Sequence, residues 1–389
     1  MRNFSHRVGT AIVLLVALVV LAGAPAAAAT PAQPEALAIP RANGFPVGTT
    51  IAALTDPSRR EPFIRASRPR SIVVQLWYPT SRKRGATAAY VSPAVARQIG
   101  RGIPGAYRAL SRARTHAFAN APALHREGGW PVVVFSPGYG VERQLYTGLV
   151  GDLASRGFVV IAIDHPQDAN VVTFPDGHTV VRGDVPENQA TIDKALATRV
   201  ADVRFLLDQL EARPAIASAG PTRADLDLTR IGMFGHSLGG ATAANVMLTD
   251  PRVVAGADLD GTIYGAAAHA HLTRPFMILA GAPGPLREKG MRGFFLRLGG
   301  PRFAVTFERA LHFAFSDLLF LLPQLTRHDP ELEGALRALL GNVLPAPTIA
   351  WQRRYLTAFF DRFLKEVPEP LLAHAPSSED VVACRCDRP

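Results

Sequence analysis

A serine at the tip of a predicted strand-to-helix turn is the residue of this chain most suited to covalent chemistry. The segment Gly235-His236-Ser237-Leu238-Gly239 follows the apolar run 230–234 and precedes the small-residue stretch 240–247. Glycine is needed at 235 and 239, because a side chain at either position would clash with the neighbouring strand or helix. The pattern predicts a nucleophile elbow, in which the Ser237 hydroxyl is exposed above a sheet.

Such a serine needs a base within hydrogen-bond reach, since its hydroxyl is a weak nucleophile at neutral pH. Five histidines follow it in the chain: His269, His271, His312, His328 and His374. Only His312 stands just past the last predicted strand, where a catalytic loop is expected. We therefore predict His312 as the base and interpret the other four as structural or solvated.

A carboxylate must orient and stabilise the protonated base. The predicted strand 275–280 is followed by no acid until Glu288, whereas the preceding strand ends in Asp258-Leu-Asp260-Gly261. Asp260 lies on the strand-to-loop turn and is the favoured acid, with Asp258 as the alternative. In a chain without the elbow, Asp260 would be interpreted as a cap of the turn before Gly261.

The oxyanion formed by attack on a carbonyl group needs two backbone donors. One is expected from Leu238, immediately after the serine, and the other from Tyr139 in the glycine-rich segment 136–140. Glycines at 138 and 140 allow the backbone to approach a substrate, although a plain tight turn has a similar sequence.

These residues must be positioned by a sheet. Eight apolar runs are predicted strands: 49–54, 71–78, 131–135, 158–163, 230–234, 253–259, 275–280 and 302–307. Helical periodicity between or after them covers 144–155, 189–210 and about 347–366. Nearly continuous apolar strands alternating with helices predict an α/β fold with a mostly parallel, eight-stranded sheet flanked by helices.

No linker or repeat divides the chain, so we expect one large domain over residues 30–376, with an insertion at about 88–127 and a polar tail at 377–389. Residues 1–29 carry two arginines, a short apolar run and small residues, which is typical of a secretory signal peptide; the alternative is an uncleaved anchor. We therefore expect a secreted, extracellular protein.

The chain is basic, with a formal net charge of +10, and its arginines cluster in 59–70 and 97–114. An anionic lipid or polymer surface would be attracted to them, but a solvated basic face is the favoured interpretation. No recognisable nucleic-acid module accompanies the charge.

The two cysteines, Cys384 and Cys386, are separated by a single residue, so a disulfide between them would close a small, strained ring. A metal site there would need more ligands, so no metal is predicted.

Together with segments 75–79, 132–140 and 152–160, the residues above resemble the platelet-activating-factor acetylhydrolases of the α/β-hydrolase superfamily. The similarity runs from about residue 48 to 364 and is most specific at the elbow, at Leu259-Asp260 and at His312-x-x-Phe-x-Asp317. The resemblance implies Ser237, Asp260 and His312 as the triad, with Tyr139 and Leu238 as oxyanion donors. The chain departs from the family at Pro137, where histidine is common, and in the insertion.

The resemblance implies hydrolysis of carboxylic esters, above all short-acyl lipid esters, through an acyl-enzyme and without a cofactor. The alternatives are a lipase or polyester hydrolase, a peptidase or amidase, and a catalytically silent binding protein. A histidine base predicts that activity falls on acidification, with a limb on the order of pH 6 to 7. The apolar segment 313–322 could border an acyl pocket, but for 318–322 we favour ordinary core packing.

Overall fold

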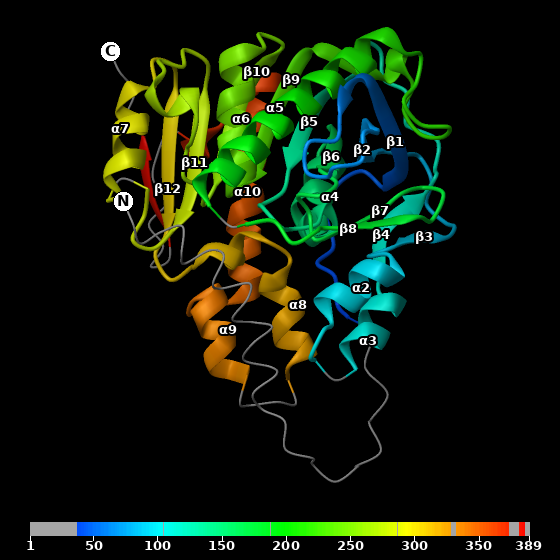
Figure 1. Ribbon diagram of the computed structural model, residues 1–389. Coiled ribbons are helices and arrows are strands. Elements are labelled where there is room, and N and C mark those ends of the chain that lie inside the picture. The colour runs from blue at the N-terminus through cyan, green and yellow to red at the C-terminus, as the bar shows by residue number, and fades with distance from the viewer. Residues whose placement is uncertain are drawn as a thin grey trace.

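One large sheet organises the chain in a computed structural model (Figure 1). The structure describes residues 37–372, except 104, 187, 286 and 328–331, together with the backbone of 381–385. Within these residues the sheet has eleven strands in the order β13-β12-β11-β10-β9-β5-β6-β2-β1-β4-β3. The predicted signal segment 1–29 and Cys386 lie outside the described residues.

All eight predicted strands are present. They are β1 (Val47–Arg60), β2 (Pro69–Pro79), β5 (Trp130–Ser136), β6 (Val159–Asp164), β9 (Leu226–His236), β10 (Val253–Leu259), β11 (Phe276–Gly281) and β12 (Arg302–Phe307). From β6 through β5 and β9 to β12 every neighbouring pair is parallel, whereas β2 pairs antiparallel with β1 and β6. The predicted α/β class and mostly parallel sheet are confirmed.

The expected count of eight strands was too low, because three strands add to the sheet edges. Strands β3 (Thr87–Ala89) and β4 (Arg114–Ala119) come from the predicted insertion, and β13 (Val381–Arg385) comes from the predicted polar tail. β3 has only three residues and β4 alternates, so neither shows the continuous apolar run of a strand buried on both faces. A separate hairpin joins β7 (Val171–Thr173) and β8 (Thr179–Val181).

Helices cover both faces of the sheet. One hydrophobic core lies beneath α4 (Thr147–Ser155) and α10 (Pro345–Leu364), and a second lies beneath α5 (Gln189–Ala212), α6 (Leu238–Thr249) and α7 (Lys289–Arg297). Along β5, Val133 and Phe135 belong to the first core and Val132 and Val134 to the second, because successive side chains point to opposite faces. A strand with two covered faces is therefore apolar throughout.

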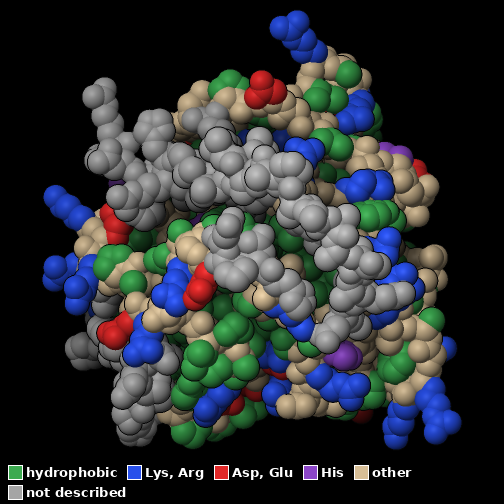
Figure 2. All heavy atoms as spheres, turned by 90° about the horizontal axis from the view of Figure 1, so that it is seen from below, with side chains coloured by type: hydrophobic (Ala, Val, Ile, Leu, Met, Phe, Trp, Pro, Cys, Tyr) green, Lys and Arg blue, Asp and Glu red, His purple; other side chains and the backbone are tan. Residues whose placement is uncertain are grey.

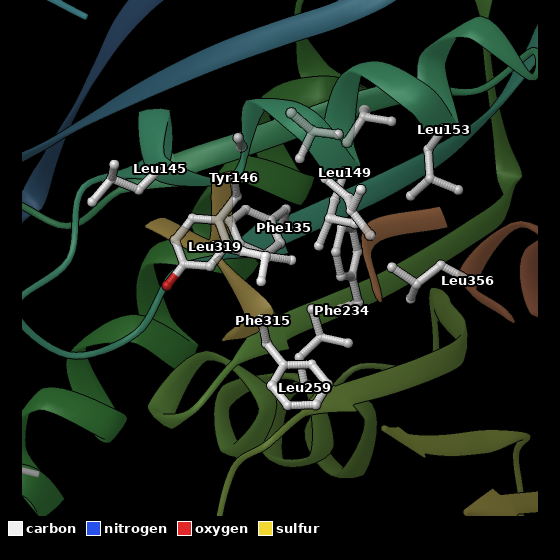
Figure 3. Packing of buried hydrophobic residues seen from close by; sticks show 14 of the residues in the cluster. Phe135, Leu145, Tyr146, Leu149, Leu153, Phe234, Leu259, Phe315, Leu319 and Leu356 are labelled. Atoms are coloured by element: carbon white, nitrogen blue, oxygen red, sulfur yellow. The ribbon is translucent and has the colours of Figure 1, made fainter. Parts of the chain in front are cut away.

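Four more helices lie together beyond one end of the strands (Figure 1). They are α2 (Pro93–Ile99) and α3 (Ala106–Arg112) from the insertion, and α8 (Leu318–Leu325) and α9 (Glu333–Leu340), which follow the 3-10 turn His312–Phe315. Phe315 and Leu319 pack into the first core beside Phe135 and Leu149, as Figure 3 shows. The core interpretation of 318–322 is thereby confirmed, apart from the partly exposed Leu318, and Phe313 and Phe315 before it are buried as well.

Of the helices in the described part of the chain, not one combines the length and the apolar character that crossing a membrane requires.

The two arginine clusters, 59–70 and 97–114, differ from each other in burial. In the 97–114 cluster the arginines are exposed, whereas in 59–70 Arg70 is buried and forms ion pairs with Glu61 and Asp202 at 2.6 and 2.7 Å. Part of the first cluster therefore belongs to the interior rather than to a solvated face.

Candidate active site

Ser237 occupies a strained turn between β9 and α6. Its backbone has φ 56° and ψ −121°, a conformation that non-glycine residues rarely adopt and that is found mainly where function requires it. A Cβ atom on Gly235 would lie 2.2 Å from the carbonyl carbon of Gly239, and one on Gly239 would lie 1.9 Å from the carbonyl oxygen of Ser136. Both contacts involve backbone, so no larger residue fits the elbow.

His312 and Asp260 meet beside this turn. His312 Nδ1 lies 2.7 Å from Asp260 Oδ2, while Asp260 Oδ1 accepts a hydrogen bond of 2.7 Å from the N–H of Gly281. A carboxylate only accepts, so Nδ1 carries the proton and the Nε2 lone pair remains for a substrate-side proton. The side chains of His312 and Asp260 are 24% and 19% exposed, so the pair is reachable but not fully solvated.

The sheet brings these residues together. Ser237, Asp260 and His312 follow β9, β10 and β12 in the parallel part of the sheet, where β9 and β10 are neighbours and β11 alone separates β10 from β12. Their loops therefore emerge at the same edge, at the carboxyl ends of the strands, where α/β proteins bind ligands. The N–H of Ser237 donates to Leu259 O at 2.9 Å, which ties the elbow to the loop that carries Asp260.

Asp258, the alternative acid, is directed elsewhere. It is fully buried, accepts from the N–H of Gly261 at 3.1 Å, and lies against Gly240, where a Cβ atom would come within 1.6 Å of its Oδ1. Burial, and secondarily the charge of Asp260, raises the pKa of Asp258 well above its usual range. The carboxyl of Asp258 is thus directed at Gly240 and Gly261, whereas that of Asp260 contacts His312, so the geometry supports Asp260.

Two of the other histidines that follow Ser237 lie at the surface. His269 and His271 are exposed, at or just after the 3-10 turn Ala266–His269. His328 and His374 fall outside the described residues. Of the histidines that follow Ser237 and that the structure describes, His312 alone has a carboxylate partner at the carboxyl edge of the sheet.

Sequence reasoning missed two residues that connect the parts of the site. His236 was expected only as an elbow residue, but it is buried and its Nε2–H donates to the backbone carbonyl of His312 at 2.9 Å. Its Nδ1 accepts from the Tyr146 hydroxyl at 2.8 Å, and burial, followed by the charge of His312, lowers the pKa of His236 well below its usual range. His236 therefore stays neutral. The position of Tyr146 in the sequence gives no signal for this contact.

The segment 136–140 packs directly against the elbow. A Cβ atom on Gly138 would lie 2.9 Å from His236 Nδ1, and the N–H of Gly138 donates to the Tyr146 hydroxyl at 3.3 Å. The Tyr139 side chain is half-buried, with its hydroxyl accepting from Arg182 Nη2 at 2.6 Å. Leu238 is the first residue of α6. The two predicted oxyanion donors thus belong to adjacent backbone segments beside Ser237.

No group of three or more His, Cys, Asp or Glu side chains in the described residues has an arrangement that could hold a metal ion. A cavity of about 370 Å³ lies away from the catalytic edge, between the segment 39–47, β4 and α4, and is lined by Trp77, His116, Asp152 and Arg353 among others. Ser237 and His312 are not among its lining residues, so this cavity does not identify the substrate site.

Comparison with known proteins decides the family. Residues 38–192 match the family model described as platelet-activating factor acetylhydrolase, isoform II. A solved ferulic acid esterase from Streptomyces cinnamoneus is 31% identical, with a TM-score of 0.76 over 90% of this chain and 100% of that chain. The chain belongs to the platelet-activating-factor acetylhydrolase-like family of α/β-hydrolases.

Two curated relatives match more than half of the chain. A probable 1-alkyl-2-acetylglycerophosphocholine esterase of Arthroderma benhamiae is 29% identical over 257 residues, which is 61% of this chain and 62% of the relative. Platelet-activating factor acetylhydrolase of Cavia porcellus is 22% identical over 58% of both chains. The matches therefore span less than two thirds of these relatives.

Proposed function

We propose that this protein is a serine esterase that hydrolyses carboxylic esters through an acyl-enzyme. The observation that carries the proposal is the 2.7 Å contact of His312 with Asp260 at the sheet edge where the strained Ser237 turn also lies. A base held in one tautomer beside a partly exposed serine on a strained turn is the arrangement that nucleophilic acyl transfer requires.

In the first half of the reaction, His312 Nε2 takes the proton of Ser237 Oγ as the oxygen attacks the ester carbonyl carbon. Asp260 stabilises the resulting imidazolium, and the backbone N–H groups of Tyr139 and Leu238 stabilise the oxyanion. Collapse of the tetrahedral intermediate breaks the bond to the alcohol, which leaves with the proton from His312. Water, activated by the same base, then hydrolyses the acyl-enzyme and regenerates Ser237.

For the substrate class we propose short-acyl lipid esters, because the family match and the curated relatives are named for acetyl-ester hydrolysis. A second candidate is an ester of a hydroxycinnamic acid, favoured by the 31% identity that extends over the whole ferulic acid esterase. We also propose that the protein is secreted, on the basis of the signal-like segment 1–29.

The exposed arginines of the insertion form a candidate binding surface for anionic lipid. Arg108 and Arg112 lie on α3, beyond the strand ends, and the coloured residues in Figure 2 show Lys and Arg side chains spread round the face seen from below. Charge reversal at both positions tests this surface. Lower activity on anionic vesicles with unchanged hydrolysis of a soluble ester supports it, and unchanged activity on both removes it.

Hydrolysis of p-nitrophenyl acetate, butyrate and palmitate and of methyl ferulate by the wild-type protein and by Ser237→Ala tests the function. Turnover that depends on Ser237 and favours acetate or butyrate supports the short-acyl proposal. Preference for methyl ferulate selects the second candidate, and preference for palmitate selects a lipase. Absence of Ser237-dependent turnover on all four esters contradicts the proposed function, and a matched amide then tests the amidase alternative.

A further inference from the structure

A buried arginine on α5, Arg199, donates hydrogen bonds to the loop 136–140, which carries the predicted oxyanion donor Tyr139. Arg199 Nη1 donates to Pro137 O at 2.5 Å and to Ser136 Oγ at 3.3 Å, and Nη2 donates to Gly138 O at 3.1 Å. Its side chain is 1% exposed and therefore cannot touch a substrate. An arginine in this place acts on the backbone of the loop.

A carboxylate fixes the guanidinium in turn. Asp168 accepts from Arg199 Nε at 2.7 Å and from Nη2 at 2.6 Å, a bidentate pair with both side chains buried. Burial alone would raise the pKa of Asp168, but the charge and hydrogen bonds of Arg199 outweigh it and lower the pKa. Because the fork is rigid and planar, the carboxylate determines where the remaining N–H groups point.

The start of the loop is held from a second side. His165 Nδ1 donates to Asp202 Oδ2 at 2.8 Å, so its Nε2 is free to accept from Ser136 Oγ at 3.1 Å. This order resembles a serine–histidine–aspartate relay, but all three residues are buried and Asp202 is already paired with Arg70. We therefore assign it a structural role in anchoring Ser136 below the loop.

The carbonyl contacts of Arg199 define the direction of two peptide planes. In a planar trans peptide the C=O and the following N–H point in opposite directions. The Pro137 carbonyl faces Arg199, and on the opposite side the N–H of Gly138 donates to Tyr146, which itself bonds His236 beside the nucleophile. The Gly138 carbonyl also faces Arg199, so the N–H of Tyr139 must point away from the arginine, toward the elbow side.

We propose that Arg199 is a positioning residue that orients the Gly138–Tyr139 peptide, so that the Tyr139 N–H serves as an oxyanion donor. The inference rests on the proposed esterase function and adds to it a side chain that, together with the N–H of Val141 at 3.2 Å, holds the Gly138 carbonyl and limits rotation of this peptide. Without the guanidinium, this carbonyl is held less firmly and can turn toward the oxyanion, where it would repel the negative charge instead of stabilising it.

Arg199→Lys tests the proposal, because lysine keeps a positive charge near Asp168 but has a point charge that cannot bond the carboxylate and both carbonyls in one plane. The double variant Arg199→Gln with Asp168→Asn is the second test. It leaves no uncompensated buried charge and is the form to use if Arg199→Lys does not fold. Arg353→Lys is the matched control, since Arg353 also holds backbone carbonyls, those of Gly148, Pro40 and Arg41.

The readouts are kcat and KM per active site, titrated by the burst of p-nitrophenol, for an oxoester and for its thionoester. Sulfur accepts hydrogen bonds poorly, so the ratio of oxoester to thionoester kcat reports the oxyanion donors. We expect Arg199→Lys to lower the oxoester kcat about 10- to 100-fold, which is less than the roughly 10²- to 10³-fold cost of losing one donor outright because the donor is misplaced rather than removed. The variant should change KM little and should lower this ratio. Arg353→Lys should keep both the kcat and the ratio.

A purely structural role for Arg199 predicts fewer titratable sites with normal kcat and a normal ratio at each, and this result overturns the proposal. An unchanged kcat and ratio in both Arg199 variants overturns it as well. These outcomes leave wild-type turnover dependent on Ser237. If the wild-type protein shows no Ser237-dependent turnover, that separate result overturns the proposed function and this inference with it.

Discussion

Asp317 is a buried acid whose ionisation opposes folding, and its removal has a predictable effect on the pH dependence of stability. Its side chain accepts from the Tyr90 hydroxyl at 2.7 Å and from the N–H of Gly148 at 3.1 Å. Burial nevertheless dominates these hydrogen bonds and raises the pKa of Asp317 from 3.8 to about 7. The folded protein therefore holds a proton at pH 5 to 6 that the unfolded chain has released.

The sign and size of the effect on the free energy of unfolding follow from this difference in protonation between the folded and unfolded states. A raised pKa in the folded state stabilises the fold below the unfolded pKa, and that contribution is lost as the pH rises toward 7. A shift of about three pKa units at about 1.4 kcal/mol each corresponds to a loss on the order of 4 kcal/mol between pH 4 and 7. Asn at 317 is neutral at every pH and can keep both hydrogen bonds, so Asp317→Asn should not show this loss.

Urea unfolding at pH steps from 4.5 to 8 measures the free energy of unfolding of the wild-type protein and Asp317→Asn. The advantage of the variant should grow up to about pH 7 and then stay constant. Asp56→Asn is a control with a pKa shift of opposite sign. Burial raises the pKa of Asp56, but hydrogen bonds from Ser58 and Arg59 outweigh burial and lower this pKa, so the folded protein favours the charged form of Asp56. A difference between Asp317→Asn and wild type that is independent of pH would refute the reasoning.

Two further substitutions test the site. Asp260→Asn should lower kcat about 10³- to 10⁴-fold with little change in KM, because the amide no longer favours the Nδ1–H tautomer of His312. The control Asp258→Asn should retain activity within a few-fold of wild type. Equal losses of kcat in the two variants would contradict the assignment of Asp260 as the triad acid. Gly239→Ala should prevent folding, measured as lost cooperative melting by circular dichroism, because its Cβ would lie 1.9 Å from Ser136 O; Gly334→Ala, with open space around it, should melt normally.

The parallel strands could be predicted because each is buried on both faces and reads as a continuous apolar run. β5, for example, is buried at all seven positions. The edge strands could not be predicted in this way. β3 is half exposed and only three residues long, and β13 is defined by its antiparallel pairing with β12, about 75 residues earlier in the chain. Such pairing depends on the folded sheet rather than on local sequence.

The candidate site shows the same division. Ser237, Asp260 and His312 could be proposed because each follows a recognisable strand, and the structure places the last two in contact. Tyr146 and Arg199 could not be proposed. A tyrosine in an apolar helix reads as core, and Arg199 lies in a helix whose sequence does not distinguish it from the second arginine there, Arg204. Their roles follow only from contacts with residues of the 136–140 loop and the elbow.

Labelling with a fluorophosphonate tests most directly whether Ser237 is an activated nucleophile. The purified protein would be treated with the probe, its intact mass and labelled peptide determined, and its ester hydrolysis followed in parallel. The account predicts one label per chain, on Ser237, with activity lost in proportion to labelling and with no labelling of Ser237→Ala. Ester hydrolysis that persists after complete labelling, or a Ser237 that stays unmodified while the ester is hydrolysed, would contradict it.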